Sequence, residues 1–324
     1  MAKPELTQNK VAILAGGWSD EAPISMESGR NVERALHEVG FTQVEVLNVA
    51  DDGFVTTLAN GGYDVAFVAM HGHYGEDGCI QGLLEILHLP YTFSGVLASA
   101  VATDKSVAKT VCSAAGITLP RGVTVAHDAM LTPKDVSTLE DTLGYPMFVK
   151  PASNGSSFGV SRVTAARQLQ DAVDRAGAGG DDVLIEECIE GIEITVPVVG
   201  TAKPYALPIV EIVFDADFYD VTVKYEAGAL HHVIPARLPE DVYRRAEEMG
   251  IAAHKALGCR GVSRTDLIVK DDGTPVMLET NMVPGMTERS LLPDAAARAG
   301  IGFPELCKRF VQDALDECDA RTPR

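Results

Sequence analysis

The sequence predicts a mixed α/β (α+β) protein that begins with a parallel sheet, and two patterns carry this prediction. Near the N-terminus, short apolar runs such as 11–17 (VAILAGG) and 64–70 (DVAFVAM) alternate with stretches of helical periodicity. Strands that alternate with helices form parallel sheets with helices on their faces. Further along, 262–281 contains two strand-like runs joined by an Asp-Asp-Gly turn, which indicates an antiparallel pair.

Length and composition indicate a globular protein and exclude several classes. The chain has 324 residues, enough for two or three domains, with 46% hydrophobic and 6% aromatic residues. A polar start and the lack of a long apolar run predict neither signal peptide nor membrane span, so we expect a cytoplasmic protein. Six scattered cysteines indicate reduced thiols, and a net charge of −19 argues against nucleic acid as a partner.

The first part of the chain places two polar loops where ligands bind in parallel sheets. The strand at 11–17 ends in a glycine pair, and a helix follows over 25–40 with a glycine stop at its end. Ligands of such sheets lie beyond the carboxyl ends of the strands. The segments 16–21 (GGWSDE) and 70–78 (MHGHYGEDG) fall at these ends.

The rest of the chain also divides into strands and helices. We expect a helix over 105–116, a strand over 145–151 and a further helix from 165 that dissolves into a glycine-rich loop. A strand over 182–189 ends in acids and makes a plausible hinge. Beyond it we predict the following elements: strands at 193–200 and 206–214, a polar loop to 235, a helix over about 240–257, strands at 262–270 and 275–281, and C-terminal helices.

The predicted strand pair carries three oxygen-bearing side chains. Glu279 and Asn281 are spaced i, i+2 and so share a face, and Asp266 lies on the partner strand. Two carboxylates and an amide are the ligands that Mg²⁺ prefers. The set is either a magnesium site or a solvated hairpin end, and the hairpin alone does not decide between them.

Three other segments have both a functional and an ordinary interpretation. The run 150–160 (KPASNGSSFGV) presents a lysine and free backbone amides that suit phosphate, although flexible loops have the same composition. The acids of 184–193 form either a solvated face or a strand that pairs with an adenine edge. The loop at 70–78 lacks a full set of zinc ligands and suits one functional histidine.

These pieces, taken in order, resemble the D-alanine–D-alanine ligase family of the ATP-grasp superfamily over essentially the whole chain. No single motif is decisive, and the ordered set is highly specific. It consists of GG-x-S-x-E with a serine at 25, HG-x-x-GEDG (71–78), DK (104–105), KP-x-x-x-GSS-x-GV (150–160), LIEE (184–187), FYD-x-x-x-KY (218–225), IPA (234–236), R-x-D (264–266) and E-x-N-x-x-PGMT-x-x-S (279–290).

The resemblance implies a fold and a reaction. The fold is an ATP-grasp fold preceded by an N-terminal parallel-sheet domain, with domains expected at 1–98, 99–190 and 191–324. In the implied reaction ATP phosphorylates the carboxylate of one D-alanine, and the amine of a second D-alanine attacks the acyl phosphate. The product is D-alanyl-D-alanine, a peptidoglycan precursor. The resemblance also implies a homodimer.

The resemblance assigns residues to ATP and metal. Lys105 and Lys150 would meet the phosphates, and the loop of Gly155, Ser156 and Ser157 would close over them. Adenine and ribose would be held by four residues: Glu186, Glu187, Ile189 and Glu193. Two Mg²⁺ ions, or Mn²⁺, would be bound by Asp266, Glu279 and Asn281.

It assigns a second group of residues to the amino acids. Glu21 would pair with the first ammonium and His71 would approach the first carboxylate, with Ser156 and Tyr225 linked to Glu21. Lys224, Ser290 and the Leu291 N–H would take the second carboxylate, while Arg264 and the Gly285 N–H would form the oxyanion site. The loop from Asp217 to Pro235 is the implied lid, because an acyl phosphate must be kept from water.

The chain departs from the family pattern at two places, and three other functions are alternatives. Trp18 stands where a small polar residue is common in the family. The family usually has Arg or His and then an acid after the first glutamate, where this chain has Ala22 and Pro23. The runner-up substrate is D-lactate or another D-amino or D-hydroxy acid in place of the second D-alanine. A silent nucleotide-binding ATP-grasp protein would be expected to lose a lysine, a metal acid or Arg264, and none is lost. An oxidoreductase is disfavoured because GxGxxG is missing after the first strand.

Overall fold

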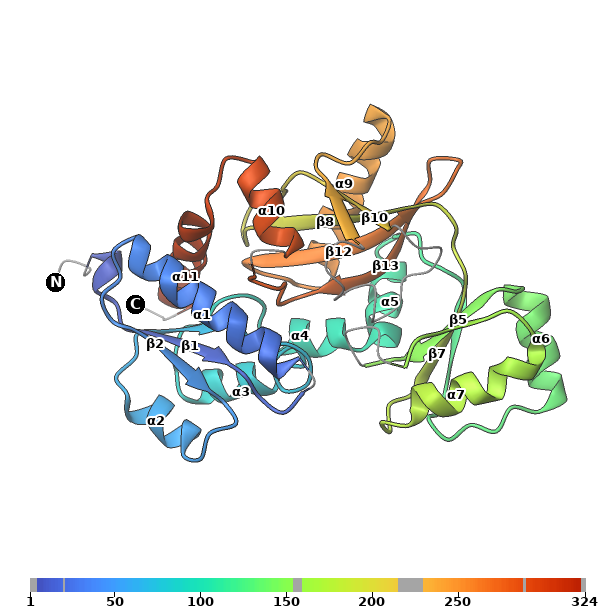
Figure 1. The fold of residues 1–324 in the computed structure, drawn as a ribbon, viewed down its shortest axis with the longest axis horizontal. Coiled ribbons are helices and arrows are strands. Elements are labelled where there is room, and N and C mark those ends of the chain that lie inside the picture. Colours follow the sequence, from blue (N-terminus) through green and yellow to red (C-terminus); the bar gives the residue numbers. More distant parts are fainter. Residues whose placement is uncertain (1–4, 20, 154–158, 215–229, 288–289, 322–324) are drawn as a thin grey trace.

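The computed structural model describes residues 5–19, 21–153, 159–214, 230–287 and 290–321. Three separate sheets and their helices make up this part of the chain (Figure 1). Among these residues no helix combines the length and the apolar character that crossing a membrane requires.

The N-terminal part is the predicted parallel sheet. Its strands are ordered β2–β1–β3, and both neighbours of β1 are parallel to it. Every residue of β1 and β3 is buried, as expected of strands covered on both faces. The elements are η1 (Leu6–Gln8), β1 (Val11–Ala15), α1 (Ala22–Glu38), β2 (Val44–Asn48), α2 (Phe54–Asn60), β3 (Val65–Val68), α3 (Cys79–Ile86) and α4 (Val96–Thr103).

The middle part carries a small antiparallel sheet with the strand order β4–β7–β5–β6. Its buried residues, among them Val149, Leu169 and Ile185, form a hydrophobic core of their own. The elements are α5 (Lys105–Ala114), β4 (Gly122–Val125), α6 (Pro133–Leu143), β5 (Met147–Pro151), β6 (Ser161–Val163), η2 (Ala166–Gln168), α7 (Leu169–Gly177) and β7 (Val183–Glu187).

The C-terminal part is built on a larger antiparallel sheet in the order β11–β10–β8–β12–β13, with β9 beside β8. The predicted pair of strands is present as β12 and β13. The elements are β8 (Ile192–Val199), β9 (Tyr205–Ala206), β10 (Val210–Phe214), β11 (Leu230–Val233), α9 (Glu240–Ala256), β12 (Val262–Val269), β13 (Pro275–Asn281), α10 (Leu291–Arg298) and α11 (Phe303–Arg321).

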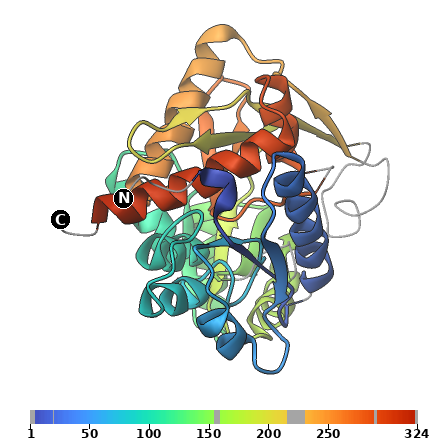
Figure 2. The same cartoon turned by 90° about the vertical axis from the view of Figure 1, so that its left-hand side faces the viewer.

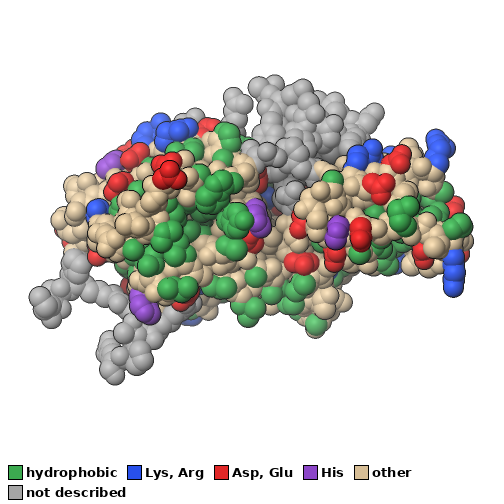
Figure 3. All heavy atoms as spheres, turned by 90° about the horizontal axis from the view of Figure 1, so that it is seen from below, with side chains coloured by type: hydrophobic (Ala, Val, Ile, Leu, Met, Phe, Trp, Pro, Cys, Tyr) green, Lys and Arg blue, Asp and Glu red, His purple; other side chains and the backbone are tan. Residues whose placement is uncertain are grey.

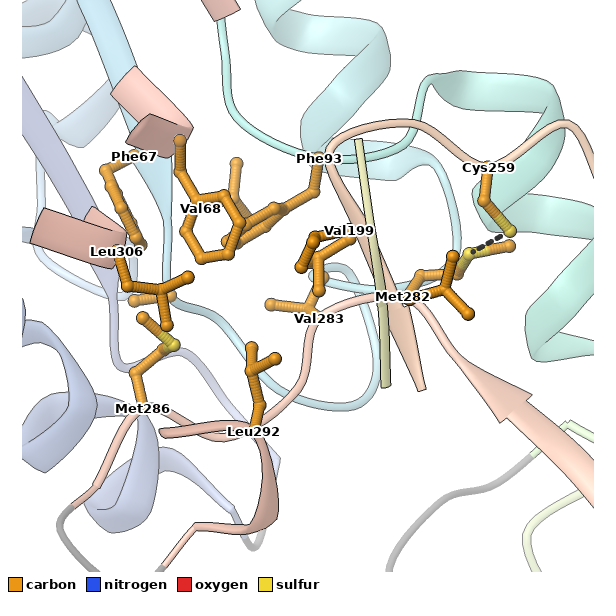
Figure 4. Close-up of a cluster of buried hydrophobic side chains, with 14 of the residues drawn as sticks. Phe67, Val68, Phe93, Val199, Cys259, Met282, Val283, Met286, Leu292 and Leu306 are labelled. Atoms are coloured by element: carbon orange, nitrogen blue, oxygen red, sulfur yellow. Dashed lines mark hydrogen bonds between the residues drawn. The ribbon is translucent and has the colours of Figure 1, made fainter. Parts of the chain in front are cut away.

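The first and last parts of the chain share one hydrophobic core. Helix α11 packs against α1 and β3, and both views place it beside the N-terminal sheet (Figures 1 and 2). Phe310 of α11 stacks edge-on against Phe93 at 5.0 Å and Phe67 at 6.4 Å between ring centroids. The same core continues to Val283, Met286 and Leu292 of the C-terminal part (Figure 4). The C-terminal end of β13 is therefore held against the N-terminal sheet.

Candidate active site

Asp266 and Glu279 lie directly opposite each other on β12 and β13, and Arg264 lies opposite Asn281. The intervening Thr265 and Thr280 are buried on the other face, where their hydroxyl groups are 3.0 Å apart. The predicted pairing, which puts the three acceptor side chains on one face, is confirmed. A register shift between Asp266 and Leu267 bends the strands just beside the carboxylates.

Two side chains hold the carboxylate of Asp266. Arg264 donates to both of its oxygens, with Nε 3.0 Å from Oδ1 and Nη2 2.8 Å from Oδ2. Thr195 of β8 donates its hydroxyl to Oδ1 at 2.5 Å. In the described part of the chain no three Cys, His, Asp or Glu side chains gather around a common point. The acceptor set here is of another kind, because it consists of two acids and an amide.

Helix α5 brings a lysine to this acceptor set. Asp104 caps the helix by accepting from the N–H groups of Ser106 and Val107. The Lys105 N–H donates to the Ala152 carbonyl at 2.8 Å, which ties the helix to the segment after β5. Lys105 Nζ then lies 3.6 Å from Glu279 Oε2. A cation from the middle of the chain and a carboxylate from its end therefore meet.

A second cluster contains Glu186 and two lysines. The side chain of Glu186 is almost fully buried, with Lys150 Nζ 2.7 Å from Oε2 and Lys109 Nζ 2.6 Å from Oε1. Burial alone would raise the pKa of Glu186, but the two ammonium groups outweigh burial and lower it. Burial lowers the pKa of Lys109, and Glu186 opposes that shift. Both lysines are therefore held within reach of any anion that displaces Glu186.

The other three residues predicted to hold adenine and ribose follow at the end of β7 and the start of β8. The side chain of Glu187 is committed to Arg121, whose Nε lies 2.7 Å from Oε2. Burial would raise the pKa of Glu187, and Arg121 lowers it below the ordinary value. Ile189 and Glu193 are half-buried, in the β7–β8 connection and on β8 respectively.

Glu21 and His71 come together on the N-terminal part. Glu21 is the N-cap residue of α1, and Pro23 lies in the first turn, where a proline fits because its missing N–H has no helical partner there. The departure at Ala22 and Pro23 is thus a standard helix start. Gly72 adopts a positive φ of 70°, and a Cβ there would lie 3.0 Å from the Glu21 carboxylate. Only glycine at position 72 therefore leaves room for the Glu21 carboxylate beside His71.

His71 is buried and bridges two elements. Its Nε2 lies 3.2 Å from the Ser28 hydroxyl of α1, and its Nδ1 lies 3.8 Å from Glu76 Oε1. Burial raises the pKa of the Glu76 carboxyl above its ordinary value, and the contact with His71 partly offsets that effect. The half-buried Glu76 and the buried His71 therefore form a polar pair next to Glu21.

The turn after β13 places Gly285 beside Ser290. A Cβ on Gly285 would lie 2.8 Å from Ser290 Oγ, so a larger residue does not fit without movement. The Thr287 N–H donates to Ser290 Oγ at 3.1 Å, and α10 begins at the next residue, Leu291. The N–H groups at the start of α10 thus follow directly after this serine.

Five of the predicted site residues lie outside the described residues: Gly155, Ser156, Ser157, Lys224 and Tyr225. The implied lid from Asp217 to Pro235 is also outside up to residue 229. Its last part differs from the predicted loop, because Leu230–Val233 form β11, paired antiparallel with β10. There His232 Nδ1 lies 2.7 Å from Asp294 Oδ2 of α10.

Two family models match separate parts of the chain. The family model described as D-ala D-ala ligase C-terminus matches residues 111–312, and the model described as D-ala D-ala ligase N-terminus matches residues 49–94. The D-alanine–D-alanine ligase of Methylibium petroleiphilum is 43% identical over 307 residues, which are 94% of this chain and 95% of the relative. The chain belongs to the D-alanine–D-alanine ligase family.

Solved structures of D-alanine–D-alanine ligases have the same fold. The enzyme from Bacillus anthracis matches with a TM-score of 0.85 and 31% identity, over 97% of this chain and 100% of that one. A structure of the Bacillus anthracis enzyme with ATP matches with a TM-score of 0.84 and 30% identity, at the same coverage. The predicted fold class is thereby confirmed.

This ligase-family site contains residues that the sequence patterns did not reveal. Lys109 follows Lys105 by one helical turn, and that spacing was the only signal for it. Thr195 contacts Asp266 from a strand 71 residues away, and Ser28 contacts His71 from 43 residues away. Neither serine nor threonine stood out, because both are common in helices and strands.

Proposed function

We propose that this chain joins two molecules of D-alanine at the expense of ATP. The γ-phosphoryl group of ATP passes to a carboxylate oxygen of the first D-alanine and gives ADP and an acyl phosphate. The amine of the second D-alanine attacks the acyl carbon, loses a proton and expels phosphate, giving D-alanyl-D-alanine. Family membership supports this reaction, as do the ligase names of relatives that align over nearly the whole chain.

One contact carries the proposal. Lys105 Nζ lies 3.6 Å from Glu279 Oε2, so a lysine suited to phosphate and a carboxylate suited to a cation share one space. Phosphoryl transfer depends mainly on positioning and on neutralising charge, which is what such a space supplies. A nucleotide-binding protein without activity would have no need to keep Arg264, Asp266 and both lysines assembled.

Asp266, Glu279 and Asn281 are the residues that would hold magnesium. They fit it because all three present oxygen atoms from one face of two paired strands. Bound Mg²⁺ would neutralise phosphate charge. The fork of Arg264 on Asp266 and the hydroxyl of Thr195 fix the carboxylate, as partners of metal ligands commonly do.

The remaining residues would bind and orient the substrates. Lys105 and Lys150 would contact the phosphates, together with the loop of Gly155, Ser156 and Ser157. Adenine and ribose would be held by Glu186, Glu187, Ile189 and Glu193. Lys150 forms an ion pair with Glu186 in this structure, so we expect the incoming nucleotide to rearrange that pair.

The D-alanine sites would use both ends of the chain. Glu21 would bind the first ammonium and His71 the first carboxylate, with Ser156 and Tyr225 closing the site. Lys224, Ser290 and the Leu291 N–H would bind the second carboxylate. Arg264 and the Gly285 N–H would donate to the oxygen on which charge develops, because such donors act best when they are fixed beforehand.

The deciding experiment is phosphate release from ATP and Mg²⁺ with and without D-alanine, with the product identified by mass. We expect release only with D-alanine, together with the dipeptide. Glu279→Gln should fold normally and lose magnesium-dependent turnover. Glu305→Gln is the matched control, because Glu305 is as exposed as Glu279, 44% against 42%, and lies on α11. ATP turnover that needs no D-amino or D-hydroxy acid would refute the proposal.

We further propose three domains at 1–98, 99–190 and 191–324, a cytoplasmic location where ATP is available, and a homodimer. The separate core within residues 139–185 supports the middle domain.

The surface of α3 and α4 is the face that we propose for the dimer. These helices expose Ile86 (78%) and Leu97 (77%), and Glu85 is the one Asp, Glu, Lys or Arg between residues 79 and 103. From below, hydrophobic side chains spread over the left half of the molecule, which carries these helices (Figure 3).

Charge favours that face for self-association. Two copies with a net charge of −19 repel each other, and the repulsion is smallest where the surface carries few charges. Leu97→Glu should therefore give a monomer in size-exclusion chromatography with light scattering. Met130→Glu is the control, because Met130 is equally exposed (77%) in the middle part. A dimer that survives Leu97→Glu would place the interface elsewhere.

A further inference from the structure

Helix α1 presents three polar side chains at i, i+3 and i+6: Ser28, Asn31 and Arg34. This spacing puts them on one face of the helix. Ser28 is fully buried and Asn31 is 8% exposed. Buried polar groups are costly unless they are hydrogen-bonded, so the partners of this face show what it does.

Two of these side chains hold the residue after Gly285. The Met286 N–H donates to Ser28 Oγ at 3.3 Å, and Asn31 Nδ2 donates to the Met286 carbonyl at 3.4 Å. Arg34 Nη2 donates to Asn31 Oδ1 at 2.5 Å, which fixes the orientation of the amide. Helix α1 therefore holds both backbone polar groups of a residue more than 250 positions away.

Gly285 depends on such neighbours, because it has no side chain to hold it. The Met286 side chain is buried in the shared core near Leu292 and Leu306 (Figure 4). Packing fixes where the turn lies, but it is not directional. The direction of the N–H groups is set by hydrogen bonds. Ser28 bonds the peptide between Gly285 and Met286 through the Met286 N–H, and Asn31 bonds the next peptide through the Met286 carbonyl.

Ser28 also touches the other substrate-binding residue of this region. Its hydroxyl lies 3.2 Å from His71 Nε2. A hydroxyl that accepts the Met286 N–H has one proton to donate, and Nε2 accepts it when the ring proton is on Nδ1, the atom that faces Glu76 at 3.8 Å. One buried hydroxyl thus links the loop after β3 to the turn after β13.

We propose that Ser28 and Asn31 are positioning residues that set the direction of the Gly285 N–H relative to His71. The proposal rests on the ligase function inferred above. Both side chains are buried and hydrogen-bonded to other residues, so each acts through Met286, and Ser28 also acts through His71. The two ends of the site are assembled on α1, whose first residue follows Glu21, so one rigid helix fixes three parts of the D-alanine site.

The test compares Ser28→Ala and Asn31→Ala with Thr92→Val. Thr92 is the matched control, because it is buried in the same part of the chain and its hydroxyl likewise accepts a backbone N–H, that of Val68, at 3.0 Å. We would measure hydrogen–deuterium exchange of the Met286 amide, the thermal midpoint, and kcat and KM for D-alanine-dependent phosphate release.

We expect Ser28→Ala to speed exchange at Met286 and to lower kcat by roughly 10- to 100-fold, with KM for ATP unchanged. Asn31→Ala should do the same to a smaller extent, and it carries the test if Ser28→Ala does not fold. In the double variant kcat should fall little below that of Ser28→Ala, because both bonds hold one residue. Thr92→Val should lower the thermal midpoint and leave kcat and Met286 exchange unchanged.

Three outcomes would overturn the proposal: kcat like that of the wild type in both single variants, a fall in kcat without faster exchange at Met286, or an equal fall in Thr92→Val. The exchange measurement needs no turnover. If the wild-type protein shows no D-alanine-dependent phosphate release, the ligase function fails, and the exchange data still show whether α1 holds the turn.

Discussion

Lys150 of β5 and Glu186 of β7 form a buried ion pair, with Nζ and Oε2 2.7 Å apart. They are diagonal neighbours on paired strands, since Phe148 lies opposite Glu186 and Lys150 lies opposite Leu184. Lys109 joins the pair from α5 at 2.6 Å from the other oxygen. Glu186 thereby lets two ammonium groups be held close together in a buried place.

Removing that carboxylate should destabilise the protein. Glu186→Gln leaves two buried cations near each other, and an unpaired buried charge costs about 3 kcal/mol or more. Lys109→Met should cost less, because Glu186 keeps Lys150 and the methionine fills the same space. Urea unfolding at neutral pH measures both. Equal stability of Glu186→Gln and the wild type would show that the three charges do not depend on one another.

Thr195→Val should weaken magnesium binding without unfolding the sheet. Valine has the shape of threonine but cannot donate to Asp266 Oδ1, which now lies 2.5 Å from the hydroxyl. Loss of such a partner typically lowers metal affinity about 10- to 100-fold. The measurement is the Mg²⁺ concentration that gives half-maximal rate. An unchanged requirement would argue against Asp266 as a ligand.

Arg264→Lys should lower activity far more than stability. Lysine keeps the charge, but it cannot reproduce the two parallel bonds of Arg264 to Asp266 at 3.0 and 2.8 Å. If the guanidinium also donates to the reacting oxygen, the rate should fall by roughly 10²- to 10³-fold. The matched control is Arg237→Lys, since Arg237, in the segment after β11, likewise donates two hydrogen bonds to one carboxylate, that of Glu211. Equal activity of the two variants would contradict the assignment.

His254 should make the protein less stable as the pH falls below 6.5. Burial lowers the pKa of His254 from 6.5 to about 4, so the unfolded chain binds a proton that the folded chain does not. Stability is highest above pH 6.5, falls down to about pH 4, and is reduced there by about 3 kcal/mol. His254→Gln should be less stable at pH 7 but should vary less between pH 6.5 and 4.5, as shown by urea unfolding across that range. If the free energy of unfolding of His254→Gln varied with pH as steeply as that of the wild type, another group would be responsible for the pH dependence.

Local sequence patterns predict the parts of the fold that depend on interactions between residues close together in the sequence. The parallel sheet followed from apolar runs that alternate with helices, and the Asp-Asp-Gly turn fixed the pairing of β12 with β13 well enough to bring Asp266 beside Glu279. The helices at 105 and 240 began where expected, because a capping residue precedes the first and two acids open the second.

The sequence does not predict the contacts between residues far apart in the chain. Thr195 meets Asp266 because β8 pairs with β12, and nothing local to either strand specifies that order. The bend beside Asp266 comes from a register shift that the alternation of residues does not reveal. Lys109 and Ser28 lie on helices whose periodicity was clear, but only the packed structure shows which face meets Glu186 or Met286.

The core shared by the two ends of the chain has a consequence for biosynthesis. The ring of Phe310 completes the packing of Phe67 and Phe93, and it is made more than 200 residues after them. During synthesis the N-terminal sheet therefore lacks the helix that covers one of its apolar sides until α11 has been made. The middle part has its own core and can fold before that. Nascent chains stopped before Phe303 should show a protease-resistant middle and a protease-sensitive beginning.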